Sequence, residues 1–388
     1  MKASGILIFT AVISLVMGMI HWLLWNRLIY TAAWPAPWLN VLTGLLIFLG
    51  LLIPLTIMAM RWTPRWVNQP LTWVAYSWLG FVFYLFFLVV LTNGVLGLIN
   101  LLGILQLSPD HRLFLARVLS IGIGATSGFI GCWGIFNMAR GFKIARIKVP
   151  IAHFPEKFSG YTIAQISDVH VGPTIGRDFV VAVVRETNAL LPDLIVITGD
   201  LVDGSVEQLR DQVEPLADLK AKDGVFFVTG NHEYYSGADA WITHLETLGI
   251  RVLRNEHVDI AGIFDLAGVD DHRSAQILPH HGQDVGKAIK GREPSRPLVL
   301  LAHQPKAIKH AVAAGVDLQL SGHVHGGQMI PFNWLVHLDQ PFISGLYRVG
   351  KTWIYVHSGT GYWGPPMRIG TTAEIALIEL VSEEIAQR

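Results

Sequence analysis

The distribution of apolar residues divides the chain into two parts of different character. Long apolar runs fill residues 1–139, where Asp110 is the only acidic residue, whereas short apolar runs alternate with amphipathic stretches from Tyr161 onward. A helix needs about 20 apolar residues to cross a bilayer, and four of the long runs reach that length. We expect membrane spans at roughly Ser4–Trp25, Trp38–Met60, Leu71–Leu91 and Leu113–Ala139.

The basic residues around these runs predict how the chain is oriented in a membrane. With four spans, both ends of the chain and the C-terminal domain are expected in the cytoplasm, because basic loops stay on that side. The stretch Asn93–Leu107 is also apolar, and it either extends the third span or lies re-entrant, whereas a fifth span there would place the two ends on opposite faces. The basic residues of the expected cytoplasmic side are Lys2, Arg61, Arg65, Arg140, Lys143, Arg146 and Lys148, and those of the other side are Arg27, Arg112 and Arg117.

A transporter is the alternative for this region. Ionisable side chains at mid-membrane mark ion or proton pathways. The second and third runs contain none, and the fourth contains only Arg117, near one end.

The first run could resemble a signal peptide, but further spans follow it without a small-residue cleavage site, which indicates an uncleaved anchor. We therefore expect an all-α anchoring bundle of about four helices, in a multi-pass protein of the plasma membrane or a bacterial inner membrane.

Beyond Tyr161 the short apolar runs predict the strands of covered sheets. They are five to seven residues long, rich in β-branched residues and apolar on both faces. The stretches 178–190 and 237–249 have the period of amphipathic helices. Alternating strands and helices indicate an α/β sandwich. The predicted strands are YTIAQIS, LIVIT, VFFVT, LVLLA, DLQLS and WIYVHS.

Five of these runs end in side chains that can bind a metal ion. Ligands of α/β proteins bind in the crevice beyond the carboxyl ends of the strands. Each motif alone is weak evidence, since a single histidine after a strand is usually structural, but five in succession predict one joint site. In chain order, the side chains are Asp168 and His170, Asp200 and Asp203, Asn231 and His232, His303, and His323 and His325.

Composition limits the chemistry of this site. The only cysteine, Cys132, lies in an apolar run, which excludes disulfides and thiolate metal sites. Imidazole, carboxylate and amide donors suit Mn, Fe or Zn better than Ca or Mg. The number of donors fits two divalent ions, as in two-metal hydrolases. A net charge of +0 gives no sign of a nucleic-acid partner.

The motifs D-x-H, G-D-x-x-D, G-N-H-E, H and G-H-x-H resemble those of the calcineurin-like metallophosphoesterase superfamily. The resemblance covers about Tyr161–Leu380. More narrowly, ISDVHVGPTIGR, VTGNHEYY, GHVHGGQM and SGTGYWGPPMRIG resemble the transmembrane proteins with a metallophosphoesterase domain. The resemblance implies a β-sandwich flanked by helices (αββα). We expect a transmembrane region at 1–140, a basic juxtamembrane linker at 141–158 and the metallophosphoesterase domain at 159–388.

The resemblance also implies a role for each strand-end ligand. A hydroxide between two metal ions would attack phosphorus and hydrolyse a phosphoester or pyrophosphate bond, as in a phosphodiesterase. Asp168, His170 and His325 would hold the first ion, Asn231, His303 and His323 would hold the second, and Asp200 would bridge them.

Two further residues are implied in proton transfer. His232 would protonate the leaving oxygen as general acid, and Asp203 would hydrogen-bond His232. The phosphoprotein phosphatases of the superfamily have an arginine directly after the second Asp of G-D-x-x-D, where this chain has Gly204. Phosphoprotein substrates are therefore disfavoured, and Arg177 or Arg368 is the alternative candidate for gripping substrate phosphate.

The segment Met329–Tyr347 suggests a class of substrate. It is apolar and aromatic although it follows a motif that binds metal. It is either a packed loop or strand that completes a sheet, or a lip that admits a lipid-linked phosphate. Some bacterial relatives cleave UDP-2,3-diacylglucosamine in lipid A biosynthesis, which fits the second interpretation. A catalytically silent domain that binds metal and senses or docks a partner is the alternative function.

Overall fold

The computed structural model describes residues 3–59, 63–104 and 106–386. The chain forms two compact units, one of residues 1–139 with 364–367 and one of residues 140–363 with 368–388. Lys2, Met60 and Arg61, which belong to the expected spans and their basic flank, lie outside the described residues.

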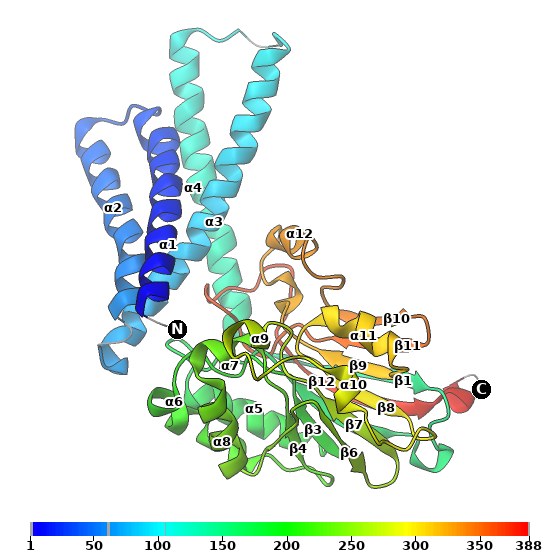
Figure 1. The fold of residues 1–388 in the computed structure, drawn as a ribbon. Coiled ribbons are helices and arrows are strands. Elements are labelled where there is room, and N and C mark those ends of the chain that lie inside the picture. Colours follow the sequence, from blue (N-terminus) through cyan, green and yellow to red (C-terminus); the bar gives the residue numbers. More distant parts are fainter. Residues whose placement is uncertain (1–2, 60–62, 105, 387–388) are drawn as a thin grey trace. The chain divides into compact units, whose positions relative to one another are not determined.

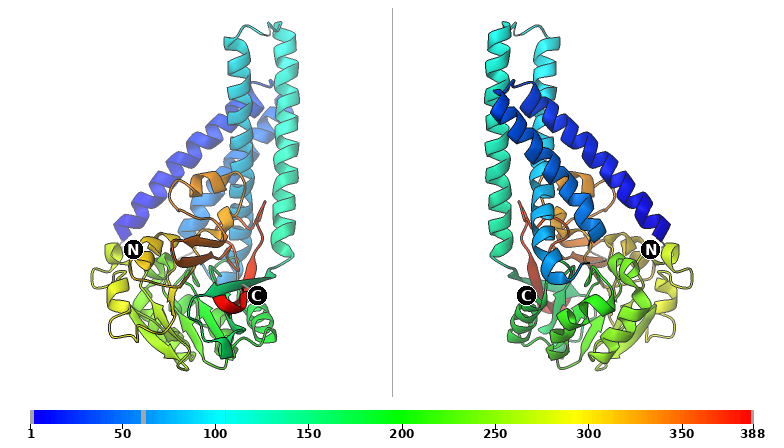
Figure 2. Two further views of the ribbon diagram at one scale, coloured as in Figure 1. Left: turned by 90° about the vertical axis from the view of Figure 1, so that its right-hand side faces the viewer. Right: turned by 90° about the vertical axis from the view of Figure 1, so that its left-hand side faces the viewer.

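The first unit is helical (Figures 1 and 2). Four of its helices are long and apolar enough to cross a membrane, so the prediction of about four such helices is confirmed. The third helix continues to Leu101, and most of the ambiguous stretch Asn93–Leu107 therefore extends it. The helices are α1 (Ala3–Leu24), continued by a π-helix (Trp25–Tyr30), α2 (Ala36–Ala59), α3 (Arg65–Leu101) and α4 (Pro109–Ala139).

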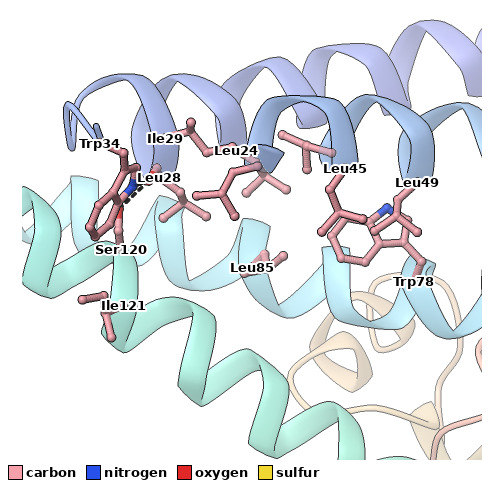
Figure 3. Close-up of a pocket in the computed structure, with 12 residues that line it drawn as sticks. Leu24, Leu28, Ile29, Trp34, Leu45, Leu49, Trp78, Leu85, Ser120 and Ile121 are labelled. Atoms are coloured by element: carbon pink, nitrogen blue, oxygen red, sulfur yellow. Dashed lines mark hydrogen bonds between the residues drawn. The ribbon is translucent and has the colours of Figure 1, made fainter. Parts of the chain in front are cut away.

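A hollow of about 290 Å³ lies between these helices (Figure 3). Leucines, Trp34 and Trp78 dominate its lining, and Ser120 contributes a hydroxyl that donates to the Leu28 carbonyl at 2.7 Å. No lining residue among those described is ionisable. An apolar hollow of this kind fits lipid-facing helix packing better than an ion pathway.

His21 is a buried titratable residue on α1, and both nitrogens of its ring have hydrogen-bond partners. Its Nε2 accepts a hydrogen bond from Trp78 Nε1 at 3.0 Å. Its Nδ1 lies 2.8 Å from the Met17 carbonyl oxygen, which accepts the Nδ1 proton of the same neutral tautomer. The imidazole therefore joins two helices of the bundle as a satisfied polar group.

Two six-stranded sheets form the second unit. The first contains, in spatial order, β1 (Lys143–Ile151), β12 (Glu374–Ser382), β2 (Tyr161–Ile166), β3 (Leu194–Ile197), β4 (Val225–Phe227) and β5 (Arg251–Val252). The second contains β10 (Gly345–Val349), β11 (Thr352–Val356), β9 (Leu318–Ser321), β8 (Leu298–Leu301), β7 (Phe264–Gly268) and β6 (Glu256–Ile260). All six strands predicted from the apolar runs are present.

Both faces of each sheet are covered, which explains why the strands are apolar on both sides. In β8, Val299 and Leu301 join the core between the sheets, whereas Leu298 and Leu300 pack with residues of the helices outside the second sheet. The predicted αββα architecture is therefore confirmed. Helices α5 (Arg177–Ala189), α6 (Val206–Val213) and α8 (Ala238–Thr247) flank the first sheet, and α10 (Val285–Ala288) and α11 (Ile308–Ala313) flank the second (Figure 1).

The segment expected as a basic linker contains strand β1. It pairs in parallel with β12, with Ile147 opposite Ile378, at the edge of the first sheet. The basic side chains of β1 face solvent, as Lys148 does beside Glu379 at 3.4 Å. The β1 pairing therefore makes much of 141–158 part of the folded domain.

Strand direction brings the predicted ligands to one place. β2, β3 and β4 are mutually parallel, and so are β7, β8 and β9. The carboxyl ends of parallel strands share one edge of a sheet, so the five motif-bearing loops can meet.

Candidate metal centre

The first group of ligands consists of Asp168, His170 and His325. One donor atom from each lies within 4.8 Å of the other two. His170 Nε2 and His325 Nε2 are 2.9 Å apart, and His325 Nε2 is 3.6 Å from Asp168 Oδ1. The three side chains come from the loops after β2 and β9, and they converge as one cation site requires.

The second group consists of Asp200, His303 and His323, again within 4.8 Å. His303 Nε2 lies 3.2 Å from Asp200 Oδ2 and 3.2 Å from His323 Nδ1. His303 Nδ1 donates to the Thr198 carbonyl at 2.7 Å, which leaves Nε2 free as a ligand atom.

Asp200 lies between the two groups. Its Oδ2 is 3.2 Å from His303 Nε2 and 3.9 Å from His170 Nε2. A single carboxylate is thus within reach of both sites, which is the arrangement that a bridging ligand requires.

The two histidines separated by Val324 face different groups, although they are neighbours in sequence. Their backbones adopt left-handed conformations, with φ of 76° at His323 and 50° at His325. Non-glycine residues rarely adopt such angles, and they concentrate at functional sites where surrounding contacts fix them. The other metal-site residues with positive φ are Asp168, His170 and Asp200.

Glycines before these residues allow the loops to approach closely. A Cβ atom at Gly322 would overlap Ser167 Oγ and Asp168 Oδ2, and one at Gly230 would overlap Asp200 Oδ1. The loops that carry the ligands can therefore pack against one another only if these positions lack a side chain.

A buried amide oxygen tests whether the residues fit metal ions. Asn231 is 7% exposed, and its Oδ1 has no hydrogen-bond partner in the described structure. The next amide, His232 N–H, donates to Asp200 Oδ1 at 2.9 Å, so Asn231 lies beside the second group. Buried polar atoms are normally paired, so an oxygen left open here fits a metal ligand.

The electrostatics of the site also favour cations. Burial alone would raise the pKa of Asp200, but the imidazoles of His303 and His232 outweigh it and hold that pKa well below its usual range. Burial followed by the charge of His303 lowers the pKa of His323 to about 3. Burial is the main cause that holds the pKa of His325 well below its usual range, and electrostatic repulsion from His170 is the next. Asp200 is therefore ionised, and the imidazoles of His323 and His325 are neutral near pH 7, as metal ligands must be. Burial would lower the pKa of His303, but the charge of Asp200 holds it well above its usual range, so a bound cation would have to displace the Nε2 proton of His303.

His232 and Asp203 form a pair next to these groups. His232 Nδ1 lies 2.6 Å from Asp203 Oδ1, and the same oxygen is 3.1 Å from His170 Nδ1. One carboxylate therefore orients both a candidate metal ligand and the candidate acid. Burial would lower the pKa of His232, but the negative charges of Asp200 and Asp203 raise it to about 9.

Glu233 is a site residue to which the sequence alone gave no role. Its Oε2 accepts from the backbone N–H groups of Gly230 and Asp200 at 2.7 and 3.0 Å, and its Oε1 accepts from Leu201 at 2.8 Å. It therefore joins the loop after β4 to the loop after β3. A signal was available, because a glutamate three residues after Gly230 at the start of a helix is typical of N-terminal capping.

The two arginines expected to grip substrate both have other partners in the structure. Arg177 is half exposed and pairs with Glu214 at 2.6 Å. Arg368 is 1% exposed, and its guanidinium donates to the carbonyls of His325, Ser358, Gly359 and Gly361. Arg368 thus holds the backbone that positions His325.

Replacing Arg368 with Met is expected to lower the free energy of unfolding by about 3 kcal/mol or more, because buried carbonyls lose their donors. The matched Arg177→Met change should cost about 0–1 kcal/mol, since it removes only a surface ion pair. Thermal unfolding of the two purified variants measures the difference. An Arg368→Met protein of unchanged stability and raised KM would restore the substrate-gripping interpretation.

Comparison with known proteins agrees with this geometry. A family described as calcineurin-like phosphoesterase matches residues 161–327. A protein from Danio rerio named "Transmembrane protein with metallophosphoesterase domain" is 38% identical over 82% of this chain and 74% of its own length. A Bos taurus protein of the same name is 39% identical over 79% of this chain and 73% of its own length. An "Uncharacterized metallophosphoesterase" from Helicobacter pylori is 39% identical over 72% of this chain and 74% of its own length. With these similarities and the two candidate ligand groups on either side of Asp200, the chain belongs to the calcineurin-like metallophosphoesterase family.

Proposed function

We propose that this protein is a membrane-anchored two-metal phosphohydrolase that breaks phosphoester or pyrophosphate bonds. The observation that carries the proposal is the position of Asp200 between two ligand groups, with the His232–Asp203 pair beside it. Mn, Fe or Zn would be held by Asp168, His170 and His325 on one side and by Asn231, His303 and His323 on the other. Asp200 would be shared.

Each protein group then has a definable task. When bound, two divalent ions would neutralise phosphoryl charge and make water a nucleophile near neutral pH. His232 Nε2, 3.9 Å from Asp200 Oδ2, faces the same space and would donate its proton to the leaving oxygen. Asp203 fixes the other ring nitrogen of His232, so the proton that can be transferred is carried on Nε2.

The full-length protein loaded with Mn is expected to hydrolyse bis(4-nitrophenyl) phosphate, to lose this activity when chelated, and to regain it with Mn. Elemental analysis should find about two ions per chain. Another group of the described chain, Asp239, His280 and His281, could also hold an ion, so His280→Ala serves as the control for stoichiometry. Two bound ions with no hydrolysis would instead support a silent metal-binding domain.

We further propose that the substrate is a lipid-linked phosphate, the class to which UDP-2,3-diacylglucosamine belongs. Four candidate membrane spans precede the domain, and the basic flanks of these spans favour the cytoplasmic face. The segment after the G-H-x-H motif contains a short helix, α12 (Phe332–Val336), on which Phe332, Trp334 and Leu335 face solvent. The exposed side chains of this apolar lip are Ile330, Phe332, Trp334, Leu335 and Leu338, with exposed fractions of 41–83%.

Changing Trp334 and Leu338 together to Ser is expected to lower kcat/KM for a vesicle-embedded lipid phosphate about tenfold or more, since each exposed apolar side chain adds to interfacial burial. Hydrolysis of the soluble diester should stay within about twofold, because neither residue is a metal ligand. Equal losses on both substrates would count against the lipid-linked substrate and leave the hydrolase proposal intact.

A further inference from the structure

Two exposed aromatic rings flank the candidate acid. The centroid of the Tyr235 ring lies 5.3 Å from that of His232, and the centroid of the Trp363 ring lies 5.9 Å away. Both meet the imidazole edge to face, with interplanar angles of 66° and 76°. Tyr235 is 45% exposed and Trp363 is 53% exposed, so each keeps open ring surface beside the catalytic groups.

The backbone holds both rings in place. Tyr235 follows His232 by three residues on α7 (Asn231–Ser236), which puts the two side chains on neighbouring positions of one helical face. Trp363 is tied to Gln328, whose amide donates to the Trp363 carbonyl at 2.9 Å and accepts from the Trp363 N–H at 3.0 Å. Gln328 lies three residues after His325, so the loop that carries His323 and His325 also fixes the indole.

The position of the Tyr235 and Trp363 rings beside His232 indicates that they contact the leaving group of the substrate. In hydrolysis, water oxygen forms a new bond to phosphorus, the bond from phosphorus to the leaving oxygen breaks, and the His232 proton goes to that oxygen. The proton released by water returns the histidine to its acid form. The leaving group must therefore lie against His232, where the open surfaces of Tyr235 and Trp363 also lie.

We propose that Tyr235 and Trp363 form a subsite for a flat unsaturated ring carried by the leaving group, such as a nucleobase or an aryl group. This inference rests on the proposed function and adds the chemistry of the departing half of the substrate. Aromatic side chains bind flat rings by stacking, which is sequence-tolerant and strengthens binding by about tenfold or more per ring. The apolar lip at Ile330–Leu338 would serve the lipid half, and the ring subsite would serve the other half.

The test uses the methyl phosphodiesters of benzyl, cyclohexylmethyl and butyl alcohol with the Mn-loaded full-length protein. The three leaving alcohols have similar acidity, so they need protonation by His232 to a similar extent and differ in having a flat ring, a puckered ring or a chain. The wild type should prefer the benzyl ester over the butyl ester by about tenfold in kcat/KM. Trp363→Leu should reduce this preference to about twofold or less, and Trp363→Phe should restore most of it.

Two controls separate ring binding from other roles. Tyr347→Leu removes an exposed aromatic ring on β10 that stacks on Phe342, and it should leave the benzyl preference unchanged. Inhibition by benzyl phosphate against butyl phosphate reports ring binding without turnover, and Trp363→Leu should abolish the difference. Equal losses on all three esters in Trp363→Leu, or losses seen only with vesicle-embedded substrates, would overturn the subsite. Absence of hydrolysis in the wild type, for these esters and for bis(4-nitrophenyl) phosphate, would instead overturn the proposed function.

Discussion

Replacing Asp200 with Asn is expected to lower kcat for phosphoester hydrolysis by at least about 100-fold and to reduce bound metal below two ions per chain. The carboxylate lies 3.2 Å from His303 Nε2 and 3.9 Å from His170 Nε2, so it serves both ligand groups. The amide is neutral and presents one oxygen instead of two, so it supplies neither the charge nor the second donor that a shared ligand needs. Elemental analysis and steady-state kinetics on the same preparation measure both effects.

The matched control is Asp239→Asn, which changes an exposed aspartate in the group Asp239, His280 and His281, which could also hold a metal. It should leave the hydrolysis rate within about twofold, because a surface substitution away from the site has little effect. Asp200→Asn keeps the oxygen that accepts the His232 N–H, so a folded variant is expected. Wild-type activity in Asp200→Asn would contradict the assignment of the bridging ligand and, with it, the two-metal mechanism.

Replacing His232 with Ala is expected to slow hydrolysis of esters with poor leaving groups by about 10²- to 10⁴-fold, the usual contribution of a general acid. Esters of 4-nitrophenol should lose much less, because that leaving group departs without a proton. Metal content should stay near the wild-type value, since the proposal assigns His232 to neither ion. A loss of bound metal would instead assign His232 to an ion, because it also lies in a third group with His170 and Asp203 that could hold one. The ratio of kcat/KM for butyl and 4-nitrophenyl diesters measures the effect.

The sign of the pH dependence follows from the same assignment. Asp200 and Asp203 outweigh burial and raise the pKa of His232 to about 9, so the proton is present below that pH and is lost as pH rises through it. Activity on poor leaving groups should therefore fall on the alkaline side. Asp203→Asn removes one of these charges, lowers the pKa of His232, and should move the alkaline limb to lower pH. An unchanged alkaline limb in both Asp203→Asn and His232→Ala would assign that limb to another group.

The apolar pattern was sufficient to predict six of the twelve strands in the described residues, and the membrane-length helices. A strand covered on both faces must be apolar throughout, as β8 is, and a helix that crosses lipid must be apolar over its length. The motifs after the strands also predicted one joint site, because parallel strands direct their carboxyl ends to one edge of a sheet. The basic segment that contains β1 was assigned to a linker instead, because an edge strand with one solvated face gives a weaker signal.

Pairing among the site residues was decided by the tertiary structure. The sequence placed Arg368 in a motif and gave it a possible contact with phosphate, but burial assigns its donors to backbone carbonyls beside His325. Glu233 belongs to the G-N-H-E motif, but its role depends on three backbone N–H groups from two loops that donate to its carboxylate. Such roles depend on which backbone segments become neighbours, and residues far apart in sequence supply them.

The sequence by itself determined six central strands, the membrane-length helices and the candidate metal-binding side chains, since these depend on local periodicity and on residue type at strand ends, and its motifs indicated the family by resemblance. The tertiary structure alone decided that Asp200 lies between two groups, that Asp203 serves both His170 and His232, and that Tyr235 and Trp363 stand beside His232. The physical reason is that distance between side chains from different loops is set by sheet packing and by left-handed backbone turns, which no single segment specifies.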